Sequence, residues 1–366
     1  MKILVVTKSL NRGGAASGNI RLLRQLELMG CELVLITEAS SSFKHDCIRK
    51  LERILDYVFL GSDCHAFKIF YPTFNMSKLL SVHKPDVVYF GDISGNLVDY
   101  SCDNLQNYTV VHRLSDIWPY GGVNHYRPNH KWLWSPKLPR VNIMLCPSNW
   151  IRQEVSSLVT KPGIMYNILR NSGLGISRKN VQSLNGGGIK LGFIAAKLTE
   201  KRKNLIGLLN ILDQLVGEIN FELHVFGGGK FSVDRHYIKY HGGFTSAGMD
   251  NVFQNFDVLV VPSSSDNSPN VIVEALSYGK PIIGNATTGV VEYVSDARTG
   301  KIVDFSAVNA VSQFFSAIGE IVDKYELLSS NCLDQYHHEH HPVQQAERFL
   351  KIIHEHSKTK REEIDY

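Results

Sequence analysis

The chain has 366 residues, of which 43% are hydrophobic and 20% are charged, and its formal net charge is +4. This length favours two domains over one, and the composition is that of a globular protein. No run of about eighteen apolar residues occurs, so the sequence predicts no membrane span. The small net charge lacks the basic excess typical of nucleic-acid-binding proteins, and we expect no nucleic acid as a partner.

The six cysteines are scattered along the chain and form no C-x-x-C pair. This pattern argues against a zinc site and against a disulfide framework, and it favours a reducing cytoplasmic location. The N-terminal segment turns polar after Val6 and has no small-residue cleavage site. It therefore predicts a first β-strand and not a signal peptide.

Short apolar runs rich in β-branched residues alternate with segments of helical periodicity in the first part of the chain. The runs predict buried parallel strands at 2–7, 32–37, 86–91, 108–113 and 142–147. A helix is expected between the first two strands, because apolar residues recur there at helical spacing before Gly30. Repeated strand–helix–strand order predicts a doubly wound α/β domain over residues 1–172.

The segment 170–188 is rich in Gly, Ser and Asn and has no periodicity, so it predicts a linker. Strands are then predicted at 189–196, 221–227, 257–263 and 280–284, which indicates a second α/β domain over residues 173–341. An amphipathic helix and a charged tail fill residues 342–366. Because open α/β sheets bind ligands beyond the carboxyl ends of their strands, we expect the two domains to face each other across a cleft.

Two loops of the first domain carry candidate binding residues. Gly13 and Gly14 precede a helix, where glycines let backbone N–H groups approach an anion; a simple tight turn is the alternative. The spacing is not G-x-G-x-x-G, so no dinucleotide fingerprint is present. The segment HRLSDIWPYGGVNHY, residues 112–126, has the density of polar and aromatic side chains that suits sugar binding. Its alternative interpretation is a structured loop with buried aromatic residues.

Two lysines and a run of glycines follow strands of the second domain. Lys197 lies just after a strand and Lys203 at the start of a helix, where two cations would hold a diphosphate. Solvated surface charge is the alternative. The run FGGGK, which includes Gly228, permits close approach of the backbone to a flat ring.

The stretch SSSDNSPNVIVEALSYG, residues 263–279, places two carboxylates at a junction between a loop and a helix. Asn270 leads into the helix, whose first N–H groups would hold a phosphate. Glu274 lies about one turn further on, within reach of a hydroxyl pair next to that phosphate. Asp266 precedes the helix and is expected nearer to the cleft. The alternative is a helix cap at Asp266 with an ordinary buried, paired glutamate.

Residues 262–294 resemble the E-x7-E signature of family-four retaining glycosyltransferases, which have the two-domain GT-B fold. Asp266 stands where that family usually has its first glutamate, and Glu274 is the second. The resemblance covers nearly the whole chain and extends to the glycine loop, the segment DIWPYGG…HY and the lysine pair. That segment is similar to a subgroup that makes bacterial surface polysaccharides such as O-antigen, lipopolysaccharide, capsule and exopolysaccharide.

The resemblance implies a role for each candidate residue. Glu274 would bind the ribose of a nucleotide-sugar donor, Asp266 the transferred sugar, and Lys197 and Lys203 the diphosphate, with Asn270 and Gly228 also on the donor side. Gly13 and Gly14 would border the acceptor and the diphosphate. The family usually reads His-Asp before the tryptophan, and here it reads Ser115-Asp116, so either Ser115 or His112 would replace the histidine. The GT-B fold also implies that the C-terminal helix returns to the first domain.

The sequence thus predicts a retaining glycosyltransferase that transfers a sugar from a nucleotide donor to a glycan or lipid-linked acceptor. No D-x-D occurs in the chain, so we expect neither a metal nor another cofactor, and the lysines and helix amides would stabilise the leaving group. The alternatives are a nucleotide-sugar epimerase on the same fold and a non-catalytic sugar-binding subunit.

A helix is also expected at 41–59, where apolar residues recur at helical spacing and basic residues fall between them. Such a helix can lie on an anionic membrane, which would place the protein peripherally at the inner face of the plasma membrane. The alternative is a helix that packs on its domain and has a solvated basic edge.

Overall fold

The computed structural model divides the chain into two compact units. Unit 1 comprises residues 1–171 and 342–366, and unit 2 comprises residues 172–341. The structure describes residues 1–10, 13–41, 43–60, 72–94, 97–121, 125, 138–159, 162–175, 183–184, 187–229, 231, 233–245, 248–294 and 297–362. Parts of the predicted linker and of the charged tail, and Tyr126 and Lys230 of the predicted loops, lie outside these ranges.

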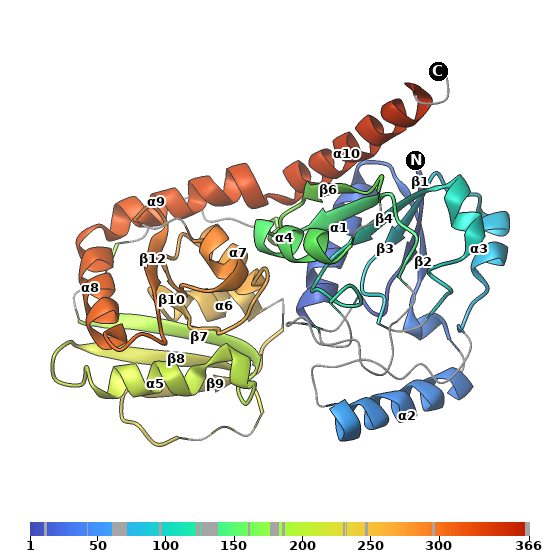
Figure 1. Cartoon of the computed structure of the whole chain (residues 1–366). Helices are drawn as coiled ribbons and strands as arrows, with labels where there is room; N and C mark the ends of the chain where they lie inside the picture. The colour runs from blue at the N-terminus through green and yellow to red at the C-terminus, as the bar shows by residue number, and fades with distance from the viewer. Residues whose placement is uncertain are drawn as a thin grey trace. The chain divides into compact units, whose positions relative to one another are not determined.

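Unit 1 contains a parallel sheet with the strand order β2-β1-β3-β4-β5-β6 in the described residues (Figure 1). The strands are β1 Lys2–Val6, β2 Glu32–Ile36, β3 Val87–Phe90, β4 Thr109–Arg113, β5 Ile143–Cys146 and β6 Met165–Ile168. β3 and β5 are buried along their whole length, and β4 is buried after its first residue, as expected for parallel strands covered on both faces. The order reverses between β1 and β3, and ligands of such folds bind at this switch point.

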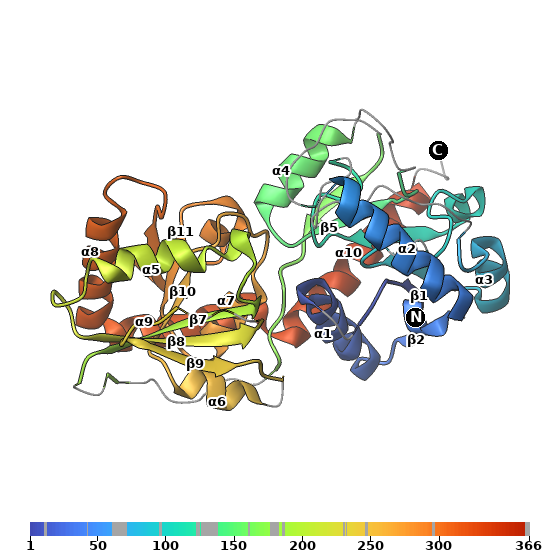
Figure 2. The ribbon, with the colours of Figure 1, turned by 90° about the horizontal axis from the view of Figure 1, so that it is seen from below.

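Helices cover both faces of the unit 1 sheet (Figures 1 and 2). They are α1 Gly14–Leu28, α3 Met76–His83, α4 Asn149–Leu158 and α10 Pro342–Glu362, with the short 3-10 turns Glu38–Ser40 and Asp103–Asn107. A further helix, α2 Phe43–Leu60, lies beyond the carboxyl ends of the strands (Figures 1 and 2). α10 packs beside α1, and its Phe349 is fully buried against Tyr89 of β3. The C-terminal helix therefore belongs to the core of unit 1.

Unit 2 contains a second parallel sheet, in which the described residues give the order β12-β11-β10-β7-β8-β9. The strands are β7 Ile189–Lys197, β8 Phe221–Gly228, β9 Ile238–Gly242, β10 Val258–Val261, β11 Ile282–Asn285 and β12 Gly300–Val303. Counted from β7, this is the order 3-2-1-4-5-6 of dinucleotide-binding folds. Its switch point lies between β7 and β10, so the loops after these two strands are where a ligand is expected.

The helices of unit 2 form two layers around its sheet. One hydrophobic cluster joins the sheet to α5 Leu205–Asp213 and α8 Ala310–Asp323, and another joins it to α6 Met249–Gln254 and α7 Asn270–Ser277. α9, Tyr325–Gln335, continues into a π-helical turn, Tyr336–His340. Pro342, which starts α10, then begins the C-terminal part of unit 1. No helix among the described residues is long and apolar enough to cross a membrane.

Candidate functional site

The loop after β7 is a tight double turn that carries both predicted lysines. Lys197 ends the strand and is exposed, and it makes no ion pair with any described residue. Glu200 N–H donates to Lys197 O (3.2 Å), and Lys203 N–H donates to Glu200 O (3.0 Å). Lys203 thus ends a 3-10 turn two residues before α5, next to the helix start at which it was predicted.

Asn204 joins this loop to the loop after β10. Its φ of 56° is left-handed, a conformation that asparagine tolerates better than most residues, and it lets α5 begin at Leu205. Its side-chain amide donates to Pro262 O (3.2 Å), just beyond β10. The two loops at the switch point are therefore fixed to each other.

Lys203 and Asp266 form an ion pair across this switch point. The NH1 atom of Arg202 lies 3.3 Å from the same carboxylate oxygen, Asp266 Oδ2. Arg202 NH1 also donates to Ser265 O (3.1 Å), and its Nε lies 2.5 Å from Glu200 Oε1. Two cations thus gather at one carboxylate, and this arrangement could hold an anionic group of a ligand in its place.

Hydrogen bonds with the segment 287–293 fix the turn between Asp266 and α7. Gly289 N–H donates to Asp266 O (3.0 Å), and Ser268 Oγ lies 2.5 Å from Tyr293 OH. A Cβ atom at position 289 would lie 1.6 Å from Asn267 O, so only glycine fits this close approach. Asp266 does not cap α7, since Pro269 occupies the N-cap position and makes no side-chain cap bond.

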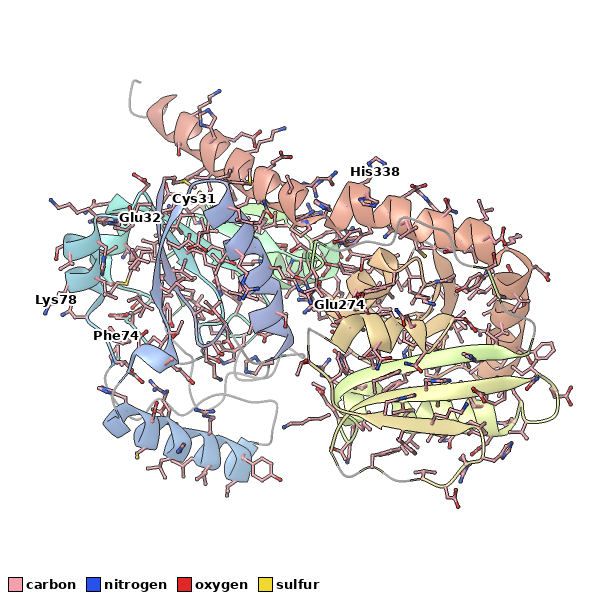
Figure 3. All side chains as sticks on the ribbon, turned by 180° about the vertical axis from the view of Figure 1, so that it is seen from behind. Cys31, Glu32, Phe74, Lys78, Glu274 and His338 are labelled. Atoms are coloured by element: carbon pink, nitrogen blue, oxygen red, sulfur yellow. The ribbon has the colours of Figure 1, made fainter. Side chains whose placement is uncertain are left out.

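Glu274 lies inside α7 and is only 4% exposed (Figure 3). Asn270, the first residue of the helix, is half-buried. Its neighbours Ile272, Val273, Ala275 and Leu276 are fully buried. The structure thus places a carboxylate in an apolar helix that follows the Asp266 turn in the sequence. Buried glutamates are rare in proteins, so Glu274 is not a surface charge.

Gly228 ends β8 next to the Lys197 loop. Its carbonyl accepts a hydrogen bond from Leu198 N–H (2.9 Å), and Lys197 pairs with Gly228 in the sheet register. At the preceding Gly227 the φ is 154° and a Cβ atom would lie 2.0 Å from Ala195 O. Gly227 and Gly228 therefore allow β7 and β8 to approach each other closely beside Lys197.

At the unit 1 switch point, the loops after β1 and β3 meet through their backbones. Lys8 N–H donates to Asp92 O (2.7 Å), and Asp92 N–H donates to Thr7 Oγ1 (3.0 Å). Lys8 Nζ also bonds Ser94 Oγ (3.0 Å). Burial would raise the pKa of Asp92, but the Lys8 charge and the hydrogen bonds from Ser94 lower it below its ordinary value, so the carboxylate stays ionised.

His112 belongs to strand β4, as the predicted strand at 108–113 has it, and the loop described over 112–126 begins only after Arg113. It is 2% exposed, and its Nδ1 lies 2.8 Å from Tyr120 OH. Burial lowers the pKa of His112 to about 4, against the smaller opposing effects of the Gly91 backbone and Asp92. The ring is therefore neutral near neutral pH and serves as a hydrogen-bonding group of fixed orientation.

Asp116 lies in the loop after β4 and holds a second histidine. Its Oδ1 accepts from Trp118 N–H (2.9 Å), and its Oδ2 lies 2.7 Å from His125 Nδ1. The ring of His125 stacks on that of Trp118, with centroids 5.8 Å apart. Asp116 is thus a positioning carboxylate that orders both an aromatic ring and an imidazole.

A small cavity opens at this edge of the unit 1 sheet. Its lining consists of Gly91, Asp92, Ile93, His112, Ser115, Asp116 and Trp118. Three residues of the predicted sugar-binding segment, His112, Ser115 and Asp116, therefore come together in one place. Carboxylate, hydroxyl and imidazole groups beside an aromatic ring are the groups that bind sugar hydroxyls and pack on sugar rings.

Gly13 and Gly14 lie at the start of α1, at the same switch point. Gly13 is exposed, has a φ of 88°, and occupies the N-cap position, while Gly14 is the first helical residue. No side chain caps this helix end. The backbone N–H groups at this helix end thus have the arrangement that binds an anion or a polar oxygen atom.

Sequence reasoning missed Asp92 and Lys8, and it gave His125 no role of its own. The signal for Asp92 was available, because it directly follows the predicted strand 86–91, and a polar residue at a strand's carboxyl end is a candidate for a site. Lys8 directly follows the first predicted strand in the same way. The pairing of His125 with Asp116 depends on the path of the loop and has no comparable signal.

Residues 188–324, which lie within unit 2, match the family model described as Glycosyl transferases group 1. A 41.2 kDa protein in the cps region of Klebsiella pneumoniae is 26% identical over 132 residues, which are 35% of this chain and 37% of that protein. A D-inositol 3-phosphate glycosyltransferase of Paenarthrobacter aurescens is 31% identical over 111 residues, 30% of this chain and 27% of that protein. The chain thus matches less than two fifths of the length of either relative.

Solved structures resemble the chain over nearly its whole length. HepE of Anabaena in complex with UDP has a TM-score of 0.64 at 13% identity, covering 97% of this chain and all of that one. Sucrose-phosphate synthase of Thermosynechococcus elongatus has a TM-score of 0.66 at 11% identity, covering 98% of this chain and all of that one. At such identity the likeness shows the fold, and it confirms the predicted GT-B fold class. The predicted resemblance to the glycosyltransferase family is confirmed by the family match in unit 2.

Proposed function

We propose that this chain is a retaining glycosyltransferase that transfers a sugar from a nucleotide-diphosphate sugar to a glycan or lipid-linked acceptor. The observation that carries the proposal is the cluster of Lys203, Arg202 and Asp266 at the switch point of the unit 2 sheet, beside the start of α7. This cluster falls within the stretch that matches the glycosyltransferase family model. Solved structures of the same fold hold UDP and UDP-glucose, which supports a nucleotide-sugar donor.

On this proposal unit 2 binds the donor. Lys197 and Lys203 neutralise the diphosphate together with the first N–H groups of α7, Glu274 binds the ribose hydroxyls, and Asp266 binds the transferred sugar. Positive groups already in place around the diphosphate would stabilise the charge that develops as the nucleotide leaves. We propose that this stabilisation needs no metal, because lysines and amides supply the positive charge and the chain has no D-x-D.

The acceptor is proposed to bind at unit 1, in the cavity beside Ser115 and Asp116. Its polar lining and the Trp118 ring suit a carbohydrate. The relative in the cps region of Klebsiella pneumoniae supports a role in making a bacterial surface polysaccharide.

Nucleotide binding followed by turnover tests the proposed function. Thermal shifts with UDP, GDP, ADP and CMP identify the base, and a nucleotide at about one hundred times its dissociation constant stabilises the fold by roughly 2.7 kcal/mol. The sugar nucleotides of that base are then incubated with the protein, with and without glycan acceptors. Transfer, or slow donor hydrolysis, supports the proposal. An epimerised sugar nucleotide without acceptor would indicate an epimerase, and binding without any turnover would indicate a sugar-binding subunit.

We propose in addition that α2 rests on an anionic membrane surface, because it turns its apolar side outward. Leu51, Ile54 and Val58 are 47%, 58% and 66% exposed, whereas Arg49 and Glu52 are buried. An ordinary domain helix shows the opposite arrangement. Lys50 is exposed at the edge of the apolar side, where a cation meets lipid headgroups.

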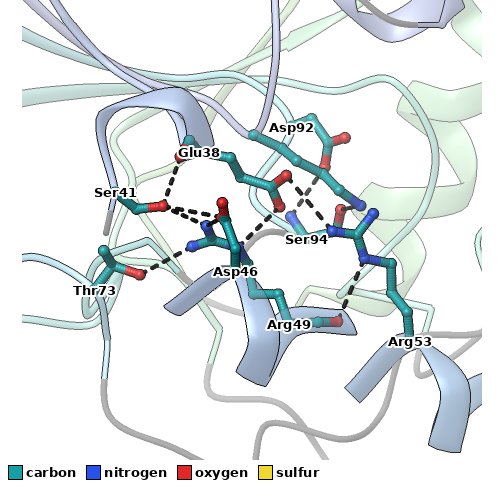
Figure 4. A network of polar contacts seen from close by, with 9 residues as sticks. Glu38, Ser41, Asp46, Arg49, Arg53, Thr73, Asp92 and Ser94 are labelled. Atoms are coloured by element: carbon teal, nitrogen blue, oxygen red, sulfur yellow. Dashed lines mark hydrogen bonds and ion pairs between the residues drawn. The ribbon is translucent and has the colours of Figure 1, made fainter. Parts of the chain in front are cut away.

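The polar side of α2 is held to unit 1 through Arg49 (Figure 4). Its guanidinium bonds Thr73 Oγ1 (3.2 Å), Ser41 and Asp46, and its Nε lies 3.6 Å from Glu38 Oε1. Arg49 is one of the basic residues that fall between the apolar ones at 41–59 and were expected to meet the membrane, but it is a buried anchor and cannot do so. The basic groups that remain at the surface of this helix include Lys50 and Arg53.

A further inference from the structure

A short chain of hydrogen bonds joins β8 to β9 in unit 2. On β8, Oε2 of Glu222 lies 3.4 Å from Nε2 of His224. Nδ1 of His224 lies 3.0 Å from Nε2 of His241, which is on β9. His224 is 4% exposed, whereas His241 is an exposed residue. The chain therefore runs from a carboxylate through a buried imidazole to an exposed one.

This chain fixes the tautomers of both histidines. An ionised carboxylate only accepts hydrogen bonds, so His224 donates to Glu222 through its Nε2–H group, and its Nδ1 is an acceptor. His241 then donates to that Nδ1 through its own Nε2–H group. Burial lowers the pKa of His224 and that of His241, which favours the neutral rings that these tautomers require. Nδ1 of His241 is left as an acceptor that makes no hydrogen bond with a residue that the structure describes.

An aromatic neighbour fixes the orientation of the His241 ring. The ring lies on that of Phe226, with centroids 4.3 Å apart and an interplanar angle of 9°. Phe244, which is 37% exposed, meets Phe226 edge-on with centroids 6.3 Å apart. His241 and Phe244 thus both contact Phe226, and they form an exposed aromatic surface at the end of β9.

This aromatic surface lies where the base of a bound nucleotide is expected. Phe226 belongs to the hydrophobic cluster that joins the sheet to α6 and α7, so the surface is on the sheet face covered by the helix of Glu274. It lies at the carboxyl end of β9, and ligands of such sheets bind beyond these ends. β9 is two strands from β7, which is about 10 Å. A nucleoside whose diphosphate is bound after β7 can span this distance.

We propose that His241 recognises the base of the nucleotide donor, with its Nδ1 accepting a hydrogen bond from an N–H group on the edge of the base. Glu222 and His224 are positioning residues, because they keep the hydrogen of His241 on Nε2 and so keep Nδ1 an acceptor. Proteins recognise unpaired bases by hydrogen bonds to their edges and by stacking on aromatic rings, and Phe244 offers such a ring. This inference rests on the proposed function, whose donor side it makes specific.

Isothermal titration tests the base contact by comparing nucleotides with a ligand that has no base. UDP, GDP, ADP, CDP and inorganic pyrophosphate are titrated into the full chain as wild type and as His241→Phe, which keeps a ring on Phe226 but removes the acceptor. The nucleotide that binds the wild type best should bind the variant about tenfold more weakly, as expected for the loss of one hydrogen bond. Pyrophosphate should show no difference. His236→Phe changes another exposed histidine, outside the chain of hydrogen bonds, and should bind as the wild type does.

Nitrogen NMR tests the positioning role, since it distinguishes a ring nitrogen that carries a hydrogen from one that does not. At about pH 8, where histidines are neutral, His241 of the wild type should carry its hydrogen on Nε2. In His224→Leu, which removes the acceptor, the hydrogen should be distributed over both nitrogens, and nucleotide binding should weaken.

Two results would overturn the inference alone. One is equal binding of the nucleotide by the wild type and His241→Phe, and the other is a wild-type His241 that carries its hydrogen on Nδ1. Failure of every nucleotide to bind the wild type would overturn the proposed function itself, on which the inference rests, so the two failures are distinguishable.

Discussion

Lys203 Nζ bonds Asp266 Oδ2 across the switch point of the unit 2 sheet, and their side chains are 16% and 13% exposed. In the proposed function one partner binds the diphosphate and the other the transferred sugar. The carboxylate therefore competes with the diphosphate for the same cation. Binding of a donor has to open this pair, and release of the nucleotide allows it to close again.

Asp266→Asn should tighten the binding of the nucleoside diphosphate by about tenfold, or about 1.4 kcal/mol, while it slows sugar transfer. Removal of the carboxylate frees Lys203 for the diphosphate and at the same time takes away the proposed sugar contact. Isothermal titration with the diphosphate and a turnover assay measure the two effects. Asp213→Asn, which breaks the ion pair with Arg235 elsewhere in unit 2, should change neither. Weaker diphosphate binding in Asp266→Asn would contradict the competition.

Lys203→Ala should slow turnover at least tenfold, because a charge-assisted bond to a phosphate contributes about 1.5–3 kcal/mol. Lys239→Ala is the matched control, since it removes an equally charged side chain from the exposed pair with Glu222. Turnover is measured with and without EDTA. Loss of activity in EDTA, together with normal activity of Lys203→Ala, would show that a metal holds the diphosphate instead.

Gly289→Ala should destabilise unit 2 by about 1–3 kcal/mol and weaken nucleotide binding. The new Cβ atom would meet Asn267 O at 1.6 Å, and a backbone oxygen cannot move without shifting the Asp266 turn. Gly319→Ala on the exposed side of α8 meets no atom within 4 Å and should stabilise by roughly 0.5–1 kcal/mol. Denaturant unfolding and nucleotide titration of both variants give the comparison, and equal behaviour would refute the claim that position 289 shapes the site.

The stability of the protein should depend on pH through His112. Its folded pKa is lowered from 6.5 to about 4, so the unfolded chain takes up a proton at a higher pH than the folded one. The contribution is fully present above pH 6.5 and is lost as the pH falls toward 4, by at most about 3 kcal/mol. Urea unfolding at pH 6.5 and at pH 4 gives the free energy of unfolding of each protein. Between these two pH values the wild type should lose more of this free energy than His112→Asn does. Parallel losses would mean that His112 is solvated and not buried.

Binding of the protein to anionic vesicles should depend on the outward side of α2. Lys50→Glu with Arg53→Glu should abolish sedimentation with phosphatidylglycerol vesicles, and Ile54→Ser with Val58→Ser should weaken it, because the helix gains roughly 1 kcal/mol per basic residue and buries apolar area. Lys78→Glu on α3 is a charge reversal of the same kind at an exposed lysine elsewhere and should have no effect. A wild-type protein that stays in the supernatant at low salt would refute the membrane proposal.

The central strands were predictable from the sequence, and several edge strands were not. β3 and β5 of unit 1 are buried throughout and appear as continuous apolar runs, and β4 is buried after its first residue. The three strands without a prediction, β6, β9 and β12, each lie at the edge of a sheet. Edge strands are covered on fewer sides and carry polar residues, so the run that marks a buried strand is missing.

The candidate site was predictable as a set of loops but not as a set of contacts. Asp266 and Lys203 could be singled out because each follows a strand at a loop–helix junction. Their pairing joins residues 63 positions apart and depends on the strand order that makes β7 and β10 neighbours. Sequence alone does not give that order, because a crossover can place the next strand on either side of the sheet.

The return of α10 to unit 1 affects the order in which the chain can fold during synthesis. Ala346, Phe349, Ile352 and Ile353 of α10 are buried in the same cluster as β1 and α1. The first 171 residues leave the ribosome without these side chains, and the apolar surface that α10 will cover stays open until unit 2 has been made. Unit 2 is continuous in sequence and can complete its core first, so the part of the protein that is synthesised earliest is the last to be finished.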